Sequence, residues 1–168
     1  MSGRKPPSQP GCTWDEDCIE MCTGRSVYVE EDGVRATFAN RKRKQIRKIH
    51  YDGCYYTGRD RRADYIVGLP GTVDVIVELK GTDTNLKGAA QQVENTLGSW
   101  QQDKKHATTI ASLIVYGRIE GKKKLPGRVP RAEAAKSSLR AAFLRAHGKL
   151  LLIHQNGEKR FSFEDFLR

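Results

Sequence analysis

Apolar and polar positions alternate through residues 73–79, and a shorter apolar run at residues 65–67 precedes them. Both stretches are rich in β-branched and aromatic residues, and the turn residues at positions 68–71 lie between them. The pattern therefore predicts a β-hairpin. Successive side chains of a strand lie on opposite faces of its sheet. One face of the second strand is then apolar, and the other holds Asp74, Ile76, Glu78 and Lys80.

A hairpin that reverses at Gly71 places Asp64 opposite Glu78. Cross-strand neighbours have Cβ atoms roughly 5 Å apart, so two carboxylates there repel each other. A divalent cation between them removes the repulsion, because Mg²⁺ binds carboxylate and water oxygens. Lys80, two residues along the strand, would then lie beside the ion and hold a water molecule. The alternative is a solvent-exposed, charged end of a structural hairpin.

The Asp64…Glu78-Leu79-Lys80 motif at the end of an apolar strand resembles the PD-(D/E)xK nuclease superfamily. Ala63-Asp64 replaces the usual Pro-Asp pair. A wider string, DYIV…VIVELKGTD…AAQQVENTL, is similar to small standalone members over about residues 46–100. The resemblance implies an α/β (α+β) fold, with a central mixed β-sheet flanked by helices around a restriction-endonuclease-like core.

The same resemblance implies a metal-dependent nuclease that hydrolyses phosphodiester bonds. A DNA endonuclease leaving 5′-phosphate and 3′-hydroxyl ends is favoured over one acting on RNA, with Mg²⁺ or Mn²⁺ as cofactor. The implied catalytic residues are Asp64, Glu78, Lys80 and Gln92, with Asp64 and Glu78 as the metal ligands. Many members of the superfamily act as dimers that cut both strands, so a homodimer of this chain is an open alternative.

Three further carboxylates are candidate accessory residues. Glu20 matches an acidic residue that many superfamily members carry on an early helix, and the alternative is a solvated helix face. Asp52 either supports the metal site or belongs to a turn with Gly53. Asp74 is an alternative first carboxylate, but strand residues four apart are roughly 13 Å from each other, so Asp64 is preferred.

The rest of the chain predicts a mixture of helices and strands. Apolar residues at helical spacing indicate helices at residues 86–100 and 132–147, and a short acidic helix at 14–22. Between the first two, residues 107–119 indicate a buried strand parallel to its neighbour. Further strands are expected at residues 26–30, 34–39, 46–56, 149–155 and 160–163, with Asp32-Gly33 turning one hairpin and Asn156-Gly157 a terminal one.

The length of 168 residues suits one domain, expected at residues 12–168 after a disordered tail at 1–11. A net charge of +10 favours polyanions, chiefly nucleic acid, with an anionic membrane surface or an acidic protein as the alternatives. No apolar run could span a bilayer and the start lacks a signal peptide, so a cytoplasmic location without membrane contact is expected. The candidate nucleic-acid-binding residues are Arg41, Lys42, Arg43, Lys44, Arg47, Lys48, Arg61, Arg62, Lys122, Lys123 and Lys124.

Four cysteines complete the set of candidate ligands. In a cytosolic protein they are expected to be reduced, as buried or incidental free thiols. The alternative is a structural Zn²⁺ site formed by Cys12, Cys18, Cys22 and Cys54, although their spacing is not that of common zinc knuckles. The four histidines are scattered without ligand spacing.

Two other classes of function stay open. One is a non-catalytic nucleic-acid-binding module that retains the nuclease fold. The other is a protein-interaction or toxin–antitoxin partner, supported only by the acidic segment 14–20. The presence of Asp64, Glu78 and Lys80 together favours the enzyme.

Overall fold

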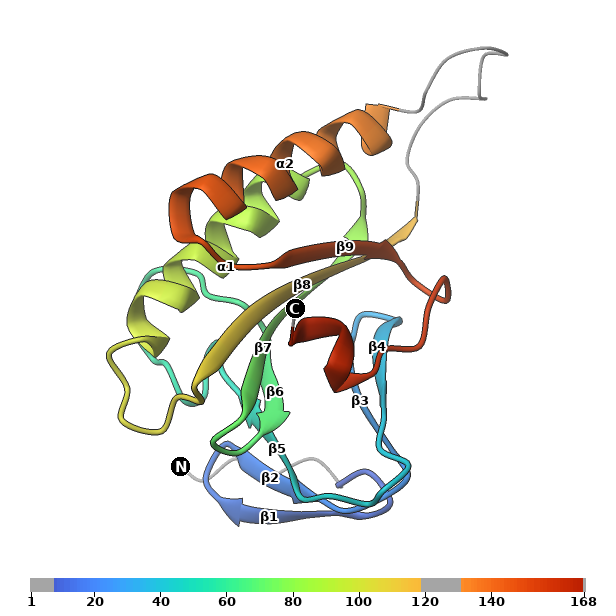
Figure 1. Cartoon of the computed structure of the whole chain (residues 1–168), viewed down its shortest axis with the longest axis vertical. Helices are drawn as coiled ribbons and strands as arrows, with labels where there is room; N and C mark the ends of the chain where they lie inside the picture. Colours follow the sequence, from blue (N-terminus) through green and yellow to red (C-terminus); the bar gives the residue numbers. More distant parts are fainter. Residues whose placement is uncertain (1–7, 119–130, 168) are drawn as a thin grey trace.

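The computed structural model describes residues 8–118 and 131–167, which form a mixed sheet of seven strands (Figure 1). The strand order is β1-β2-β5-β6-β7-β8-β9. Neighbours from β1 to β7 are antiparallel, whereas β8 is parallel to β7 and β9 to β8. The mixed sheet and two helices confirm the α/β class. The strands are Cys12–Glu16 (β1), Ile19–Cys22 (β2), Ile46–His50 (β5), Tyr65–Leu69 (β6), Val73–Thr82 (β7), Thr109–Arg118 (β8) and Leu151–Gln155 (β9).

The central hairpin has the predicted register. Tyr65 pairs with Val77 and Val67 with Val75, which continues to Asp64 opposite Glu78. Gly71 makes the turn with a φ of 79°, a left-handed conformation that suits glycine. Residues 73–79 are all buried, because β7 lies inside the sheet with layers on both of its faces.

Both helices cover one face of the sheet (Figure 1). Helix α1 (Leu86–Trp100) connects β7 to β8 as the predicted crossover, and the Asn85 side chain caps its start by accepting a hydrogen bond from the Gly88 amide. Helix α2 (Arg131–His147) packs against α1 and β9. Val93 and Leu97 of α1 and Phe143 of α2 belong to the same apolar cluster.

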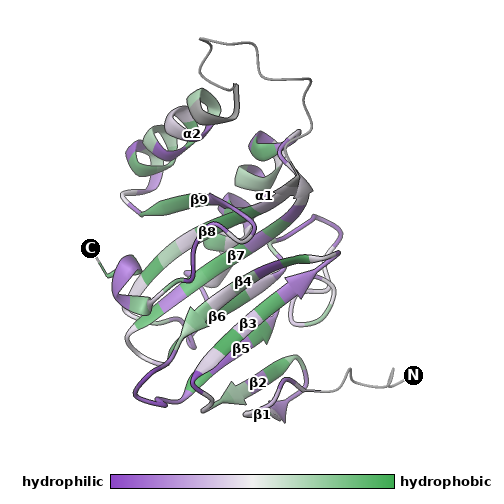
Figure 2. Ribbon diagram, turned by 90° about the vertical axis from the view of Figure 1, so that its right-hand side faces the viewer, coloured by the Kyte–Doolittle hydropathy of each residue, from purple (hydrophilic) through white to green (hydrophobic). Residues whose placement is uncertain are grey.

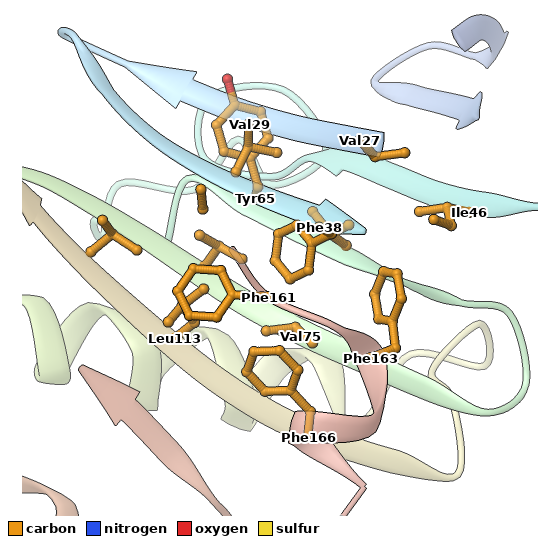
Figure 3. Packing of buried hydrophobic residues seen from close by; sticks show 14 of the residues in the cluster. Val27, Val29, Phe38, Ile46, Tyr65, Val75, Leu113, Phe161, Phe163 and Phe166 are labelled. Carbon is orange, nitrogen blue, oxygen red and sulfur yellow. The ribbon is translucent and has the colours of Figure 1, made fainter. Parts of the chain in front are cut away.

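The opposite face is covered by a small hairpin and the C-terminal segment. Strands β3 (Ser26–Glu31) and β4 (Val34–Ala39) form the hairpin predicted from Asp32-Gly33, and these two residues have positive φ angles of 51° and 80°. The 3₁₀ helix η1 (Phe163–Phe166) follows β9. Phe38 stacks on Phe163 with ring centroids 5.3 Å apart, and Phe161 and Phe166 complete this core (Figure 3). Figure 2 shows apolar residues repeating along these strands.

Three predicted elements are wrong. Residues 14–22 form no helix but the β1–β2 hairpin, since Cys18 has a φ of 71° that interrupts any helix there. The third strand ends at His50 rather than continuing to Tyr56, because residues 51–56 turn back on themselves. The terminal hairpin does not form. Phe161 instead makes a single parallel bridge to Phe38, and β9 pairs with β8.

The cysteines form two disulfides, Cys12–Cys22 and Cys18–Cys54. The expectation of free thiols is therefore wrong, and the alternative zinc site is excluded because no thiolate is left to bind an ion. Cys12 faces Cys22 across the β1–β2 pair, which brings residues ten apart in sequence together. The second bridge ties the turn of this hairpin to the loop after β5.

Two predicted segments fall partly or wholly beyond the described residues. The tail expected at residues 1–11 is described only from residue 8, where the Gln9 side chain binds the main chain of β3 at Ser26 and Tyr28. Lys122, Lys123 and Lys124 lie outside the described part. Within it, neither helix has the length and apolar character needed to cross a bilayer.

Candidate active site

Two carboxyl groups meet where β6 begins, on the face of the sheet that α1 covers. Asp64 lies just before β6 and Glu78 lies in β7, and their carboxyl groups are close enough for each to shift the pKa of the other. The Leu79 amide donates to Asp64 Oδ2 over 2.9 Å and holds that carboxylate toward β7. The two-residue period of the strands, together with the turn at Gly71, creates this juxtaposition.

Lys80 and Gln92 complete the cluster. Lys80 Nζ lies 3.6 Å from Glu78 Oε1 and donates to Gln92 Oε1 over 2.6 Å. Gln92 is a buried residue of α1, and its Nε2 donates to the Arg62 carbonyl over 3.4 Å. The structure thus brings together all four residues that the family resemblance implied as catalytic. We call Asp64, Glu78, Lys80 and Gln92 the carboxyl-pair site.

Burial raises the pKa of both acids, and their neighbours make the two pKa values differ. Glu78 is 2% exposed, and desolvation together with the charge of Asp64 raises its pKa to about 9, against the opposing charge of Lys80. Desolvation also raises the pKa of Asp64, but the Leu79 amide limits the rise to about 6. At neutral pH Asp64 is therefore ionised and Glu78 protonated.

The Glu78 Oε2 atom is consistent with this protonation state. It is buried and receives no hydrogen bond from any N–H or O–H group of the described residues. A buried ionised carboxylate without donors is strongly destabilised. A proton on the Glu78 carboxyl removes the charge, so the pair holds one proton between two acids.

Asp74 lies in a separate, internal network at the other end of β7. Its side chain is fully buried and accepts hydrogen bonds from Trp100 Nε1 over 2.9 Å and from the Ala107 amide over 2.7 Å. Arg47 NH2 lies 3.2 Å from Asp74 Oδ1. These contacts occupy both carboxylate oxygens, so Asp74 joins β5, β7 and α1 and is not part of the carboxyl-pair site.

The other two accessory candidates are also bound elsewhere. Glu20 lies in β2 on the opposite face of the sheet, where its Oε2 is 2.6 Å from His50 Nε2 and 3.3 Å from Lys48 Nζ. Despite the opposing effect of burial, these cationic and hydrogen-bonding partners lower its pKa. Asp52 lies in the turn after β5 and accepts from the Arg62 amide over 3.3 Å, which matches the turn alternative.

The expectation of a Mg²⁺ or Mn²⁺ centre is contradicted by the positions of these acids. Within residues 8–118 and 131–167, no three His, Cys, Asp or Glu side chains are grouped so that they could hold a metal ion. The carboxyl-pair site offers two such ligands, Asp64 and Glu78. The acids that would have supplied a third, Glu20, Asp52 and Asp74, are held by their own partners.

The basic candidates divide into three groups. Arg41, Lys42, Arg43 and Lys44 are exposed in the β4–β5 loop, which lies at the end of the sheet away from Glu78. Arg47 and Lys48 are ion-paired inside the protein. Arg61 is exposed near Glu78 and lowers its pKa, while Arg62 lies over the Tyr56 ring at 4.3 Å and donates to the Asn95 carbonyl.

Sequence reasoning missed two basic residues that extend the loop group. Arg25 and Arg160 line a hollow together with Arg41. They are 135 positions apart in the chain (160 minus 25), and neither belongs to a motif. No local signal could have joined them, because only the packing of the C-terminal segment on β4 brings them together.

Compared with models of protein families, with curated proteins and with solved structures, the chain matches none. The resemblance to the PD-(D/E)xK nucleases therefore rests on its own motif residues. What the carboxyl-pair site can do is argued below from its chemistry.

Proposed function

We propose that this protein is a nuclease that hydrolyses phosphodiester bonds at the carboxyl-pair site. The observation that supports the proposal is the convergence of Asp64, Glu78, Lys80 and Gln92 at one end of the β6–β7 hairpin. A buried acid pair with strongly raised pKa values reduces stability, and such groups cluster at functional sites. A hairpin with only a structural role would gain no stability from this arrangement.

The finer part of the fold belongs to the same proposal. The motif residues lie on an antiparallel β5-β6-β7 meander that is followed by the α1 crossover and by the parallel strand β8. This order supports a restriction-endonuclease-like core, with the Glu-x-Lys segment on its central strand β7.

The site has the groups that general acid–base hydrolysis needs. Ionised Asp64 can accept a proton from the attacking water, and protonated Glu78 can return one, so that water is added across the P–O bond that breaks. Lys80 can stabilise the negative charge that develops on the phosphate. Because the described residues do not form a three-ligand metal site, no step is assigned to a metal ion.

Nucleic acid is the proposed substrate, with DNA favoured over RNA as the motif resemblance implies. The net charge of +10 attracts a polyanion. Arg61 is exposed and close enough to Glu78 to act on its pKa, so a cationic group lies next to the proposed reaction centre.

A second candidate is nucleic-acid binding without cleavage. The densest basic segment, residues 41–44, lies at the other end of the sheet from the carboxyl-pair site. A binding module needs the basic surface alone. In that case the chain would bind nucleic acid in a salt-dependent manner, and no phosphodiester bond would break.

The proposed location also differs from the sequence expectation. Disulfides persist in oxidising compartments and are rare in the cytosol. The two disulfides therefore favour an oxidising environment over the cytoplasm. This inference is separate from the proposed chemistry.

The experiment incubates the full chain with end-labelled single- and double-stranded DNA and RNA, with a chelator in one series and added divalent cations in another. Asp64→Asn and Lys80→Met remove the proposed base and the cationic group. Asp60→Asn and Lys87→Met remove the same charges at exposed positions.

We expect the first two variants to cleave at least about 100-fold more slowly, with binding retained, and the controls to match the parent. Equal cleavage by all five proteins would place the reaction elsewhere, and binding with no cleavage in either series would favour the second candidate.

A further inference from the structure

Two adjoining hollows with basic linings lie near the β4–β5 loop. The smaller one, of about 490 Å³, is lined by Arg25, Ala39, Arg41 and Arg160, and we call it the arginine pocket. The larger one, of about 610 Å³, shares Ala39, Arg41 and Arg160 with it and extends along the loop toward η1. The shared residues make the two hollows one continuous surface.

Main-chain hydrogen bonds fix the positions of the three arginines. Arg25 and Arg41 flank the open end of the β3–β4 hairpin, where the Asn40 amide donates to the Arg25 carbonyl over 2.7 Å. Arg160 is brought there by its neighbour Phe161, whose amide donates to Thr37 and whose carbonyl accepts from Ala39. Phe161 is itself anchored in the core next to Phe38. The arginines therefore project from a rigid frame.

The pocket has a large excess of positive charge. Among the described residues, no carboxylate forms an ion pair with Arg25, Arg41 or Arg160. Lys42, Lys44 and Lys159 line the adjoining hollow. Of its two acids, Asp165 lies 3.3 Å from Lys159 Nζ and accepts from the Ser162 amide.

The second acid is Glu164, and its pKa is affected by the positive charges around it. It is exposed, and hydrogen bonds to its own backbone and to Ser162, together with the charges of Lys42 and Lys44, lower its pKa. Six basic side chains and two acids thus line the two hollows. The excess positive charges repel one another, and an anionic ligand relieves that repulsion.

Guanidinium groups are suited to phosphate, because their planar N–H donors match its oxygens in pairs. We propose that the arginine pocket is a phosphate subsite that binds the backbone of a nucleic acid strand remote from the carboxyl-pair site. Leu69, which lines the adjoining hollow and is half-buried, provides an apolar contact beside the phosphates for the sugar or base.

The subsite is separate from the proposed reaction centre. Leu69 of the larger hollow is five residues from Asp64 along β6, which corresponds to about 17 Å. The two sites also belong to opposite faces of the sheet, since Leu69 packs in the core with β3 and β4. At 3.4 Å per nucleotide, a strand that occupies both sites needs more than about five nucleotides.

This inference rests on the proposal that the chain binds nucleic acid but not on cleavage, so its test measures binding alone. The full chain is titrated with a fluorescein-labelled single-stranded oligonucleotide of twelve nucleotides, and anisotropy is read at several salt concentrations. Gels confirm that the oligonucleotide stays intact during the reading. Arg25→Ala, Arg160→Ala and the double variant are compared with Arg145→Ala, which removes the same charge from an exposed position on α2.

For the double variant we expect about tenfold weaker binding at low salt. Its slope of log affinity against log salt should be shallower by about 0.7 for each arginine that contacts a phosphate. Arg145→Ala should match the parent in both quantities. Arg25 and Arg160 are exposed, so the substitutions should leave the fold intact, and circular dichroism checks this.

Two results would overturn the subsite. One is an unchanged affinity and salt slope for the double variant, and the other is an equal loss in the double variant and Arg145→Ala, which would indicate net charge alone. Loss of cleavage in Asp64→Asn with normal binding concerns the nuclease proposal only. The failures of the two proposals are thus distinguishable.

Discussion

Glu78→Gln separates the stability of the carboxyl-pair site from its proposed activity. Glutamine keeps the shape of the side chain and retains an N–H group that can donate to Asp64, as protonated Glu78 can. It carries no charge at any pH. The variant therefore removes the titration of Glu78 without opening a cavity, and the protein should become more stable and less active together.

The raised pKa of Glu78 gives the size of the effect. The carboxyl titrates near 4.5 in the unfolded chain and at about 9 in the folded protein. Because the folded state holds the proton more tightly, the contribution of Glu78 to stability is fully present below pH 4.5 and is lost as pH rises toward 9. Each pH unit in this window costs about 1.4 kcal/mol, so about 3 kcal/mol is lost between pH 4.5 and pH 7.

The assay is urea unfolding at pH 5, 6, 7 and 8, followed by tryptophan fluorescence. The free energy of unfolding of the parent should fall with pH relative to that of Glu78→Gln, and the difference should grow to about 3 kcal/mol at pH 7. That difference corresponds to a Tm about 6–12 °C higher for the variant. Asp60→Asn, at a position 75% exposed, should follow the parent. Parallel curves for the parent and Glu78→Gln would refute the buried, protonated state of Glu78.

Three other outcomes follow from the contacts. Asp74→Ala should lower the free energy of unfolding by about 3–5 kcal/mol in urea melts, since it leaves the buried Trp100 Nε1 and Ala107 N–H groups without an acceptor and the largely buried Arg47 without its ion-pair partner; a change below 1 kcal/mol would contradict the network. Reduction of the disulfides should lower Tm, with the Cys18–Cys54 bridge, which closes a loop of 36 residues, contributing about 3–4 kcal/mol. Peptide mapping without reduction should recover both bridges, and free thiols in the native protein would contradict this. Lys80→Met should reduce kcat for DNA cleavage more than it raises KM, because the lysine acts on charge that develops in the transition state; a change confined to KM would indicate a role in binding only.

The centre of the molecule could be predicted because its signals are local. Alternation along β7 and the turn at Gly71 determine the β6–β7 register, and that register alone places Asp64 beside Glu78. The helical spacing of residues 86–100 and the short connections on either side determine α1 and the parallel strand β8.

The structure of the outer segments could not be predicted, because contacts with residues far away in the sequence determine it. The acidic segment 14–22 has the spacing of a short helix, but pairing with β5 and the bridge from Cys18 to Cys54 make it two strands. Residues 160–163 have the pattern of a strand, but Phe161 and Phe163 pack into the core beside Phe38. The internal pairing of Asp74 with Arg47 also joins residues of different strands, which no motif signals.

The pH dependence of DNA cleavage tests the central claim most directly, because the proposed reaction needs Asp64 ionised and Glu78 protonated at once. The account predicts a bell-shaped profile of kcat/KM, with limbs at about pH 6 and about pH 9. Cleavage that keeps rising through pH 9, or no cleavage at any pH by a protein that binds DNA, would contradict it.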